Sequence, residues 1–255
     1  MNILEQIKAK DRMVDIISVT PEATVLDTID AMLGKNSNGI LVVDDGNLKG
    51  IVSDFDLIKW LKEGKIKSVH IKISDIMTEE VIYAHPDDEL KQIVNLMFER
   101  SSRFIPIVLD NKPLGVITRK EIGKIFAKHY GHRYKARDLM TYRYATFSLN
   151  DSLETFFRKM GGYDDKYSII ISDGDVVGVI TPINILKHLR QKRTIDIKTD
   201  VKDLMTENPY VAKPGDRCDK IANIMVNRNL SGVPIVDKHL EGLIRYSCFL
   251  QFMEK

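Results

Sequence analysis

The sequence predicts an α/β fold built from four consecutive repeats of about 64 residues. One short phrase returns four times: a glycine, two branched apolar residues and a fourth residue that usually carries a hydroxyl group. Its copies are 65, 63 and 64 residues apart. They begin at Gly50, Gly115, Gly178 and Gly242. A second phrase, Asp-x-Met-Thr, keeps the same spacing. Its copies begin at Asp75, Asp138 and Asp203, with a degenerate copy at Asp11.

Each repeat is predicted to contain a strand at the methionine phrase, a helix, two strands and a second helix, which makes a βαββα unit. In the first repeat the apolar periodicity predicts a helix over 25–33, and the apolar run 40–43 predicts a buried strand. Residues 44–46 form a turn, 48–52 the returning strand, and the second helix begins at Ser53. The corresponding first strands of the later repeats are predicted at 105–109, 167–171 and 233–236.

The repeat boundaries follow from these landmarks. Residues 1–11 are predicted to form a short amphipathic helix, and the repeats occupy 12–66, 67–130, 131–194 and 195–255. A unit of this size buries little of its surface, so pairs of repeats are the expected folding domains. The boundary between the two pairs is placed in segment 128–137, which has no apolar periodicity.

Composition narrows the class of protein. The 255 residues are 44% hydrophobic and carry a formal net charge of +2. No stretch approaches the ~20 apolar residues of a membrane span, and two cysteines do not make a disulfide framework. A soluble, cytoplasmic protein is expected. His129 and His132 lack carboxylate support, so no metal site is predicted. The chain has no Walker loop, nucleophile elbow or HExxH motif, and no catalytic residues are predicted.

The Asp-x-Met-Thr phrase and the phrase Gly-h-h-Ser/Thr-x-x-Asp, where h is an apolar residue, together resemble tandem cystathionine β-synthase (CBS) domains. The likeness runs from Arg12 to Phe252. It implies that two repeats pair into a Bateman module and that clefts between paired repeats bind AMP, ADP, ATP or S-adenosylmethionine. Four repeats in one chain resemble the γ subunit of AMP-activated protein kinase and archaeal stand-alone CBS proteins. A regulatory sensor without a catalytic cofactor is therefore expected.

The start of each second helix supplies candidate ligand contacts. Ser53 and Asp56 form the pattern of a helix capping box, which alone explains both residues. Capping is compatible with ligand binding, because the amides of a helix start attract phosphate. The resemblance implies that the hydroxyl column meets phosphate and the acidic column meets ribose. The hydroxyl column is Ser53, Thr118 and Thr181, and the ribose column is Asp56, Glu121 and Asn184. The fourth repeat has Arg245 and Cys248 at these positions and lacks the ribose clamp.

A second set of candidates surrounds the phosphate position. One column just before the first strand of each hairpin contains Asn38, Arg103, Lys166 and Ser231. Arg103 is the strongest candidate because its planar fork can hold phosphate at two points. Arg119 and Lys120 occupy another column that the resemblance assigns to phosphate. The alternative for each cation is a solvated surface residue. Thr78, Thr141 and Thr206 are expected near the clefts, although threonine is also an ordinary choice at a strand entry.

Other functions remain open at this point. The segment 128–137 interleaves basic residues with rings, as single-strand nucleic-acid binders do, but the net charge of +2 argues against that function. An S-adenosylmethionine sensor and a structural subunit with vestigial clefts are further alternatives. The expected partners are adenine nucleotides, then a regulated enzyme or kinase, with a homodimer open and no membrane partner.

Overall fold

The computed structural model describes residues 3–66, 68–159 and 167–253, and it confirms the α/β fold. The chain divides into two compact units. The first unit runs to Ile122 and also includes the chain from Leu250, and the second unit runs from Gly123 to Phe249.

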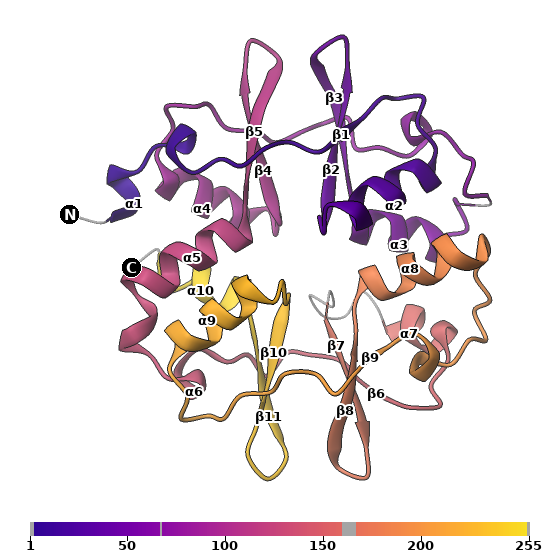
Figure 1. Ribbon diagram of the computed structural model, residues 1–255, viewed down its shortest axis with the longest axis vertical. Coiled ribbons are helices and arrows are strands. Elements are labelled where there is room, and N and C mark those ends of the chain that lie inside the picture. Colours follow the sequence, from indigo (N-terminus) through magenta and orange to yellow (C-terminus); the bar gives the residue numbers. More distant parts are fainter. Residues whose placement is uncertain (1–2, 67, 160–166, 254–255) are drawn as a thin grey trace. The chain divides into compact units, whose positions relative to one another are not determined.

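The first unit contains two similar groups of elements (Figure 1). In the first group, β1 runs parallel to β2, and β2 and β3 form an antiparallel hairpin. In the second group, β4 and β5 form the equivalent hairpin, and Leu48 N donates to Asn111 O between the two hairpins at 2.9 Å. The elements are α1 Ile3–Gln6, η1 Ala9–Asp11, β1 Ser18–Val19, α2 Val25–Gly34, β2 Gly39–Asp44, β3 Asn47–Ser53, α3 Asp54–Lys62, η2 Ile73–Asp75, α4 Leu90–Glu99, β4 Phe104–Leu109, β5 Lys112–Thr118 and α5 Arg119–His129, whose residues from Gly123 belong to the second unit.

The second unit repeats this plan. A four-stranded sheet has the order β6-β7-β8-β9, and β10 pairs with β11 in a hairpin. The elements are η3 Gly131–Arg133, α6 Ala136–Leu139, β6 Thr146–Ser148, α7 Leu153–Lys159, β7 Ser168–Ser172, β8 Asp175–Ile180, α8 Pro182–Lys192, η4 Val201–Asp203, β9 Thr206–Glu207, α9 Cys218–Asn227, β10 Gly232–Val236, β11 Leu240–Arg245 and α10 Tyr246–Leu250.

The hairpin turns form where the sequence predicts them. Asp45 and Gly46 connect β2 to β3 with φ values of 48° and 77°. Asp110 and Asn111 connect β4 to β5 with φ values of 49° and 63°. Two successive residues with positive φ are typical of the two-residue turn that matches the twist of a hairpin, and Asp, Asn and Gly tolerate this conformation best.

The methionine phrase differs from the prediction of a strand in three of the four repeats. Among the described residues only the copy at Thr206 enters a strand, β9, and it pairs with β8 of the preceding repeat. The other copies make a single bridge after a helical turn, also to the other repeat of the pair. Thr78, for example, pairs with Ile51, and Thr141 pairs with Leu243. Each copy therefore crosses to its partner repeat.

The two sequence phrases are contact partners, which explains this exchange. A Cβ atom on Gly50 would lie 2.7 Å from the sulfur of Met77, and one on Gly242 would lie 2.7 Å from the sulfur of Met140. Met13 packs on Gly115, and Met205 on Gly178, in the same way. Only a residue without a side chain lets the methionine approach the return strand so closely. The methionine thus fixes the pairing of two repeats.

The segment before each methionine phrase caps the first helix of the partner repeat. Val25 N at the start of α2 donates to Ile71 O, and Leu90 N at the start of α4 donates to Ile7 O, both at 2.9 Å. These bonds satisfy amides that a helix start otherwise leaves without partners. They also shorten the predicted N-terminal helix. α1 ends at Gln6, because Ile7 caps α4 and Lys8 bridges to Glu89.

Aromatic residues close the contact between paired repeats. In the first unit the ring of Phe104 covers Gly39, where any Cβ atom would overlap the ring. In the second unit Tyr167 covers Gly232, with a closest approach of 3.2 Å to a Cβ built there. Both aromatic side chains are buried, and burial also raises the pKa of Tyr167. These contacts hold the strand starts of two repeats together, beside the predicted phosphate column.

Candidate functional site

The start of α3 holds the best-formed candidate site. Ser53 is the N-cap, and its Oγ accepts from Asp56 N at 3.1 Å. In return Asp56 Oδ2 accepts from Ser53 N at 2.9 Å and from Ser53 Oγ at 2.6 Å. Within the described chain no hydrogen bond reaches Asp56 Oδ1. The capping box therefore fixes one carboxylate oxygen and leaves the other without a hydrogen bond in the described chain.

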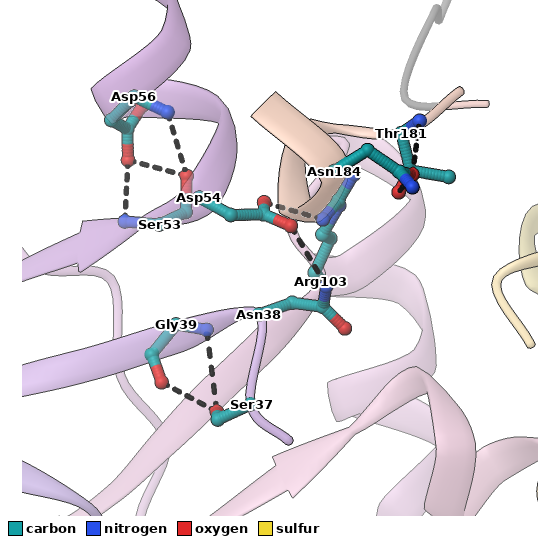
Figure 2. Close-up of polar contacts among 9 residues, drawn as sticks. All are labelled: Ser37, Asn38, Gly39, Ser53, Asp54, Asp56, Arg103, Thr181 and Asn184. Atoms are coloured by element: carbon teal, nitrogen blue, oxygen red, sulfur yellow. Dashed lines mark hydrogen bonds and ion pairs between the residues drawn. The ribbon is translucent and has the colours of Figure 1, made fainter. Parts of the chain in front are cut away.

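Next to this capping box lies a buried ion pair that joins the two repeats (Figure 2). Asp54 is fully buried, and its Oδ1 lies 2.5 Å from Nη1 of Arg103, whose side chain is 13% exposed. Asp54 Oδ2 accepts from Asn38 Nδ2 at 2.7 Å, and Asp54 N donates to Asn38 O at 2.9 Å. The structure thus brings the predicted residues Asn38 and Arg103 together through an acid that the sequence reasoning missed.

Asp54 compensates two positive features at once. It is the first residue of α3, where the helix dipole favours a negative charge. It also faces Arg103, the strongest predicted phosphate contact. The sequence carried a signal for this role, because the corresponding positions of the later repeats hold Arg119, Pro182 and Tyr246, and only the first repeat has an acid there. The start of α3 therefore differs electrostatically from its counterparts.

The site of the second repeat is formed more loosely. Glu121 N donates to Thr118 Oγ1 at 3.4 Å, close to the limit of a hydrogen bond. Arg119 Nε donates to Ser102 O at 2.8 Å, and Arg119 N donates to Arg103 O at 3.0 Å. These bonds tie the first turn of α5 to the strand start of the same repeat. Lys120 follows in that turn and is half-buried.

In the third repeat, Asn184 of the ribose column hydrogen-bonds to Thr206 of a methionine phrase. Asn184 Oδ1 accepts from Thr181 N at 3.0 Å and from Thr181 Oγ1 at 2.7 Å. Asn184 Nδ2 donates to Thr206 Oγ1 at 3.0 Å. The structure brings these three predicted residues together, but their bonds use much of the capacity of the asparagine side chain. Lys166, the predicted cation of this repeat, lies outside the described residues.

The fourth repeat has no carboxylate in its ribose column. Cys248 is 5% exposed, and its Sγ accepts from Arg245 N at 3.5 Å. Arg245 Nη2 donates to Arg143 O at 3.3 Å. Ser231 is half-buried and directly precedes β10. A buried thiol is a weak hydrogen-bonding group, so it does not replace the carboxylate of Asp56.

The remaining threonines of the methionine phrase have backbone roles. Thr78 exchanges both backbone hydrogen bonds with Ile51, at 2.9 and 3.0 Å. Thr141 pairs in the same way with Leu243, and its Oγ1 accepts from Arg143 N at 3.1 Å. Thr78 and Thr141 therefore lie beside the return strands that lead to Ser53 and Arg245, respectively.

In segment 128–137, the ring of Tyr130 packs against neighbouring side chains. Tyr130 stacks on buried Phe126 at 6.4 Å between ring centroids, and Phe126 stacks on Phe249 at 4.3 Å. Arg133 lies over the ring of Tyr130 at 6.0 Å. This packing uses Tyr130 inside the fold. In the described part of the chain, no group of three or more His, Cys, Asp or Glu residues could hold a metal ion, and no helix has the length and apolarity of a membrane span.

The chain belongs to the CBS domain family, because the model of that family matches four times. The matched ranges are residues 9–63, 73–128, 136–191 and 201–255. With the pairing described above, the two units are the paired CBS repeats called Bateman modules.

Comparison with individual proteins agrees with this assignment. Uncharacterized protein MJ1225 of Methanocaldococcus jannaschii is 22% identical over 93% of this chain and 95% of its own length. Its crystal structure, described as a proposed archaeal homologue of the AMP-activated protein kinase γ subunit, has a TM-score of 0.86 at 20% identity and covers 96% of this chain and 99% of that chain. An uncharacterized conserved protein from Pyrococcus horikoshii has a TM-score of 0.65 at 21% identity, covering 97% of this chain and 100% of that one. These identities show a shared fold.

A shorter match links the chain to an enzyme. Inosine-5′-monophosphate dehydrogenase of Methanocaldococcus jannaschii is 34% identical over 125 residues, which are 48% of this chain and 24% of the dehydrogenase. The length of the match equals about two CBS repeats.

Proposed function

We propose that this chain is a non-catalytic regulatory protein that binds adenine nucleotides, AMP, ADP or ATP, between its paired CBS repeats. The observation that carries the proposal is the geometry of Asp56. Ser53 holds one carboxylate oxygen in place, and the other oxygen has no partner in the described chain. A fixed carboxylate oxygen is a strong acceptor for the hydroxyls of a ribose.

The surroundings of Asp56 supply the contacts for a phosphate. The amides at the starts of α3 and α5 favour anions, and Ser53 and Thr118 add hydroxyl groups there. Arg103 uses one of its five N–H donors for Asp54, so the same guanidinium has further donors for a phosphate oxygen. In the second repeat, the proposed ribose contact is Glu121, and the proposed phosphate contacts are Arg119 and Lys120. In the third repeat, the proposed ribose contact is Asn184, and the proposed phosphate contacts are Thr181 and Lys166.

Occupancy is proposed to change how a regulated enzyme or kinase interacts with the paired repeats. Ligand binding stabilises the state of the chain that binds it best, and so it shifts the population toward that state. The methionine contacts and the aromatic contacts already join the two repeats of each unit, so a ligand between them acts on an existing interface.

Calorimetric titration with AMP, ADP, ATP and S-adenosylmethionine tests the proposal. Asp56→Ala should weaken binding ten- to a hundredfold, about 1.5 to 3 kcal/mol, because it removes hydrogen bonds to a charged acceptor. Asp27→Ala is the matched control. Asp27 forms the same capping box with Thr24 at the start of α2, with bonds of 2.9, 2.7 and 3.1 Å, and it is not a proposed ligand contact.

The control separates capping from binding. Both variants should lose about 1 kcal/mol of stability from the cap, whereas only Asp56→Ala should lose affinity. Equal affinities in the wild type and Asp56→Ala would remove Asp56 from the site. Tightest binding of S-adenosylmethionine would replace the nucleotide by that ligand. Oligonucleotide binding that falls steeply with salt, without saturable nucleotide binding, would favour a nucleic-acid function instead.

A further inference from the structure

The buried acid beside the candidate site carries an inference about ligand charge, which rests on the proposed function. We propose that Asp54 is a specificity-determining residue. It makes the site of the first repeat favour adenosyl compounds whose 5′ group carries at most one phosphate, and it selects against a triphosphate.

The first step is the state of the cation. Arg103 is the strongest predicted phosphate contact of the first unit, yet its Nη1 lies 2.5 Å from Oδ1 of Asp54. Asp54 is fully buried and the Arg103 side chain is 13% exposed, so solvent screens this pair little. The charge of Arg103 is therefore balanced at close range before any ligand arrives. A ligand phosphate meets a neutral pair rather than a lone cation.

The second step is the state of the helix start. A phosphate at a helix N-terminus replaces the missing partners of the first amides and benefits from the positive end of the dipole. In α3 the first residue is itself an anion, and Asn38 and Arg103 hold its carboxylate in place. The first residues of α5, α8 and α10 are Arg119, Pro182 and Tyr246. Only α3 of these four helices carries its own negative charge at this position.

The third step connects this charge to the ribose contact. Asp56 stands two residues after Asp54 in the first turn of α3, and one helical turn rises only ~5.4 Å. A ribose held at Asp56 Oδ1 therefore places its 5′ group close to the start of the helix. One phosphate can use the further N–H donors of Arg103 while the bond to Asp54 persists. Each additional phosphate either draws Arg103 away from Asp54, which leaves a buried carboxylate without its cation, or lies beside that carboxylate as a second anion. Both effects grow with the number of phosphates.

A charge series of adenosyl ligands tests the inference. The probes are 5′-methylthioadenosine, AMP and ATP, titrated calorimetrically into the full chain carrying Glu121→Ala and Asn184→Ala, so that Asp56 is the remaining proposed ribose contact. We expect ATP to bind at least tenfold more weakly than AMP. Asp54→Asn keeps the shape of the side chain and removes its charge, so it should raise the affinity for ATP at least tenfold relative to 5′-methylthioadenosine.

The outcomes separate this inference from the proposed function. ATP binding as tightly as AMP before Asp54 is changed overturns the inference, and this ranking does not depend on the folding of any Asp54 variant. The inference is also overturned if Asp54→Asn does not change the ratio of the ATP affinity to the 5′-methylthioadenosine affinity. If binding is lost in Asp56→Ala but ATP ranks first, the proposed function stands and only the inference fails. If none of the three compounds binds saturably, both fail.

Discussion

Because Arg103 forms a buried ion pair with Asp54, the substitution Arg103→Ala should lower the free energy of unfolding more than the loss of an exposed charged residue would. Arg103→Ala leaves the carboxylate of Asp54 fully buried with Asn38 as its remaining side-chain partner. Removing one partner of a buried ion pair typically costs ~3–5 kcal/mol, whereas exposed pairs contribute ~0–1 kcal/mol. Because Arg103 is 13% exposed and Asp54 is not exposed at all, the larger range applies.

Urea denaturation measures this loss, with the unfolding midpoint and slope compared between variants. Lys10→Ala is the matched control. Lys10, near the N-terminus, forms a 2.7 Å ion pair with Asp87 of the second repeat, but both of these side chains are exposed. The control should leave the midpoint almost unchanged. The double variant Asp54→Asn/Arg103→Gln should recover most of the loss, since no buried charge remains. A loss below 1 kcal/mol for Arg103→Ala would refute the reasoning.

Three further predictions follow from the same structure. Gly50→Ala should destabilise the chain by ~1–3 kcal/mol in urea denaturation, because the new Cβ would lie 2.7 Å from the sulfur of Met77. Gly215→Ala is the control and should have little effect, because nothing lies within 4 Å of a Cβ there. Equal effects of the two substitutions would contradict the methionine contact. Burial raises the pKa of Cys218 to about 12, so the folded state keeps a proton that the unfolded thiol loses above about 8.5. Stability should therefore fall as pH rises from about 8.5 toward 12, and Cys218→Ala should reduce that fall; an identical pH profile would refute this. Calorimetric stoichiometry should not exceed three adenosyl ligands per chain, because buried Cys248 replaces the acid of the fourth repeat, and four equivalents would be inconsistent with that assignment.

Much of the fold could be predicted from the sequence because the same local patterns of turn residues and apolar residues occur in all four repeats. Hairpin turns follow from Asp, Asn and Gly, and helices and strands follow from apolar periodicity. The exchange of the methionine phrase between repeats could not be predicted in this way. Periodicity shows which face of a segment is buried but not which segment covers it. Met77 and Gly50 both belong to the repeated phrases, and only the fold shows that they touch.

In the candidate site, too, local contacts could be predicted from the sequence and long-range contacts could not. The capping pair of Ser53 and Asp56 is local, so its spacing alone predicts the geometry. The partner of Arg103 is 49 residues away in the sequence, and an acid at the start of a helix is ordinary on a surface. The sequence shows that only the first repeat has an acid at this position, but it does not show that Asp54 is buried, because that follows from the packing of two repeats. The ligand roles of Asp56, Glu121 and Asn184 stay predictions.

A crystal structure of the chain grown with saturating AMP tests the central claim most directly. The account predicts a nucleotide in the first unit whose ribose hydroxyls donate to Asp56 Oδ1 while Ser53 still holds Oδ2. It also predicts that no ribose is held at Cys248. A structure at saturating AMP with no nucleotide at Asp56, or with a nucleotide whose ribose is held at Cys248, would contradict the account.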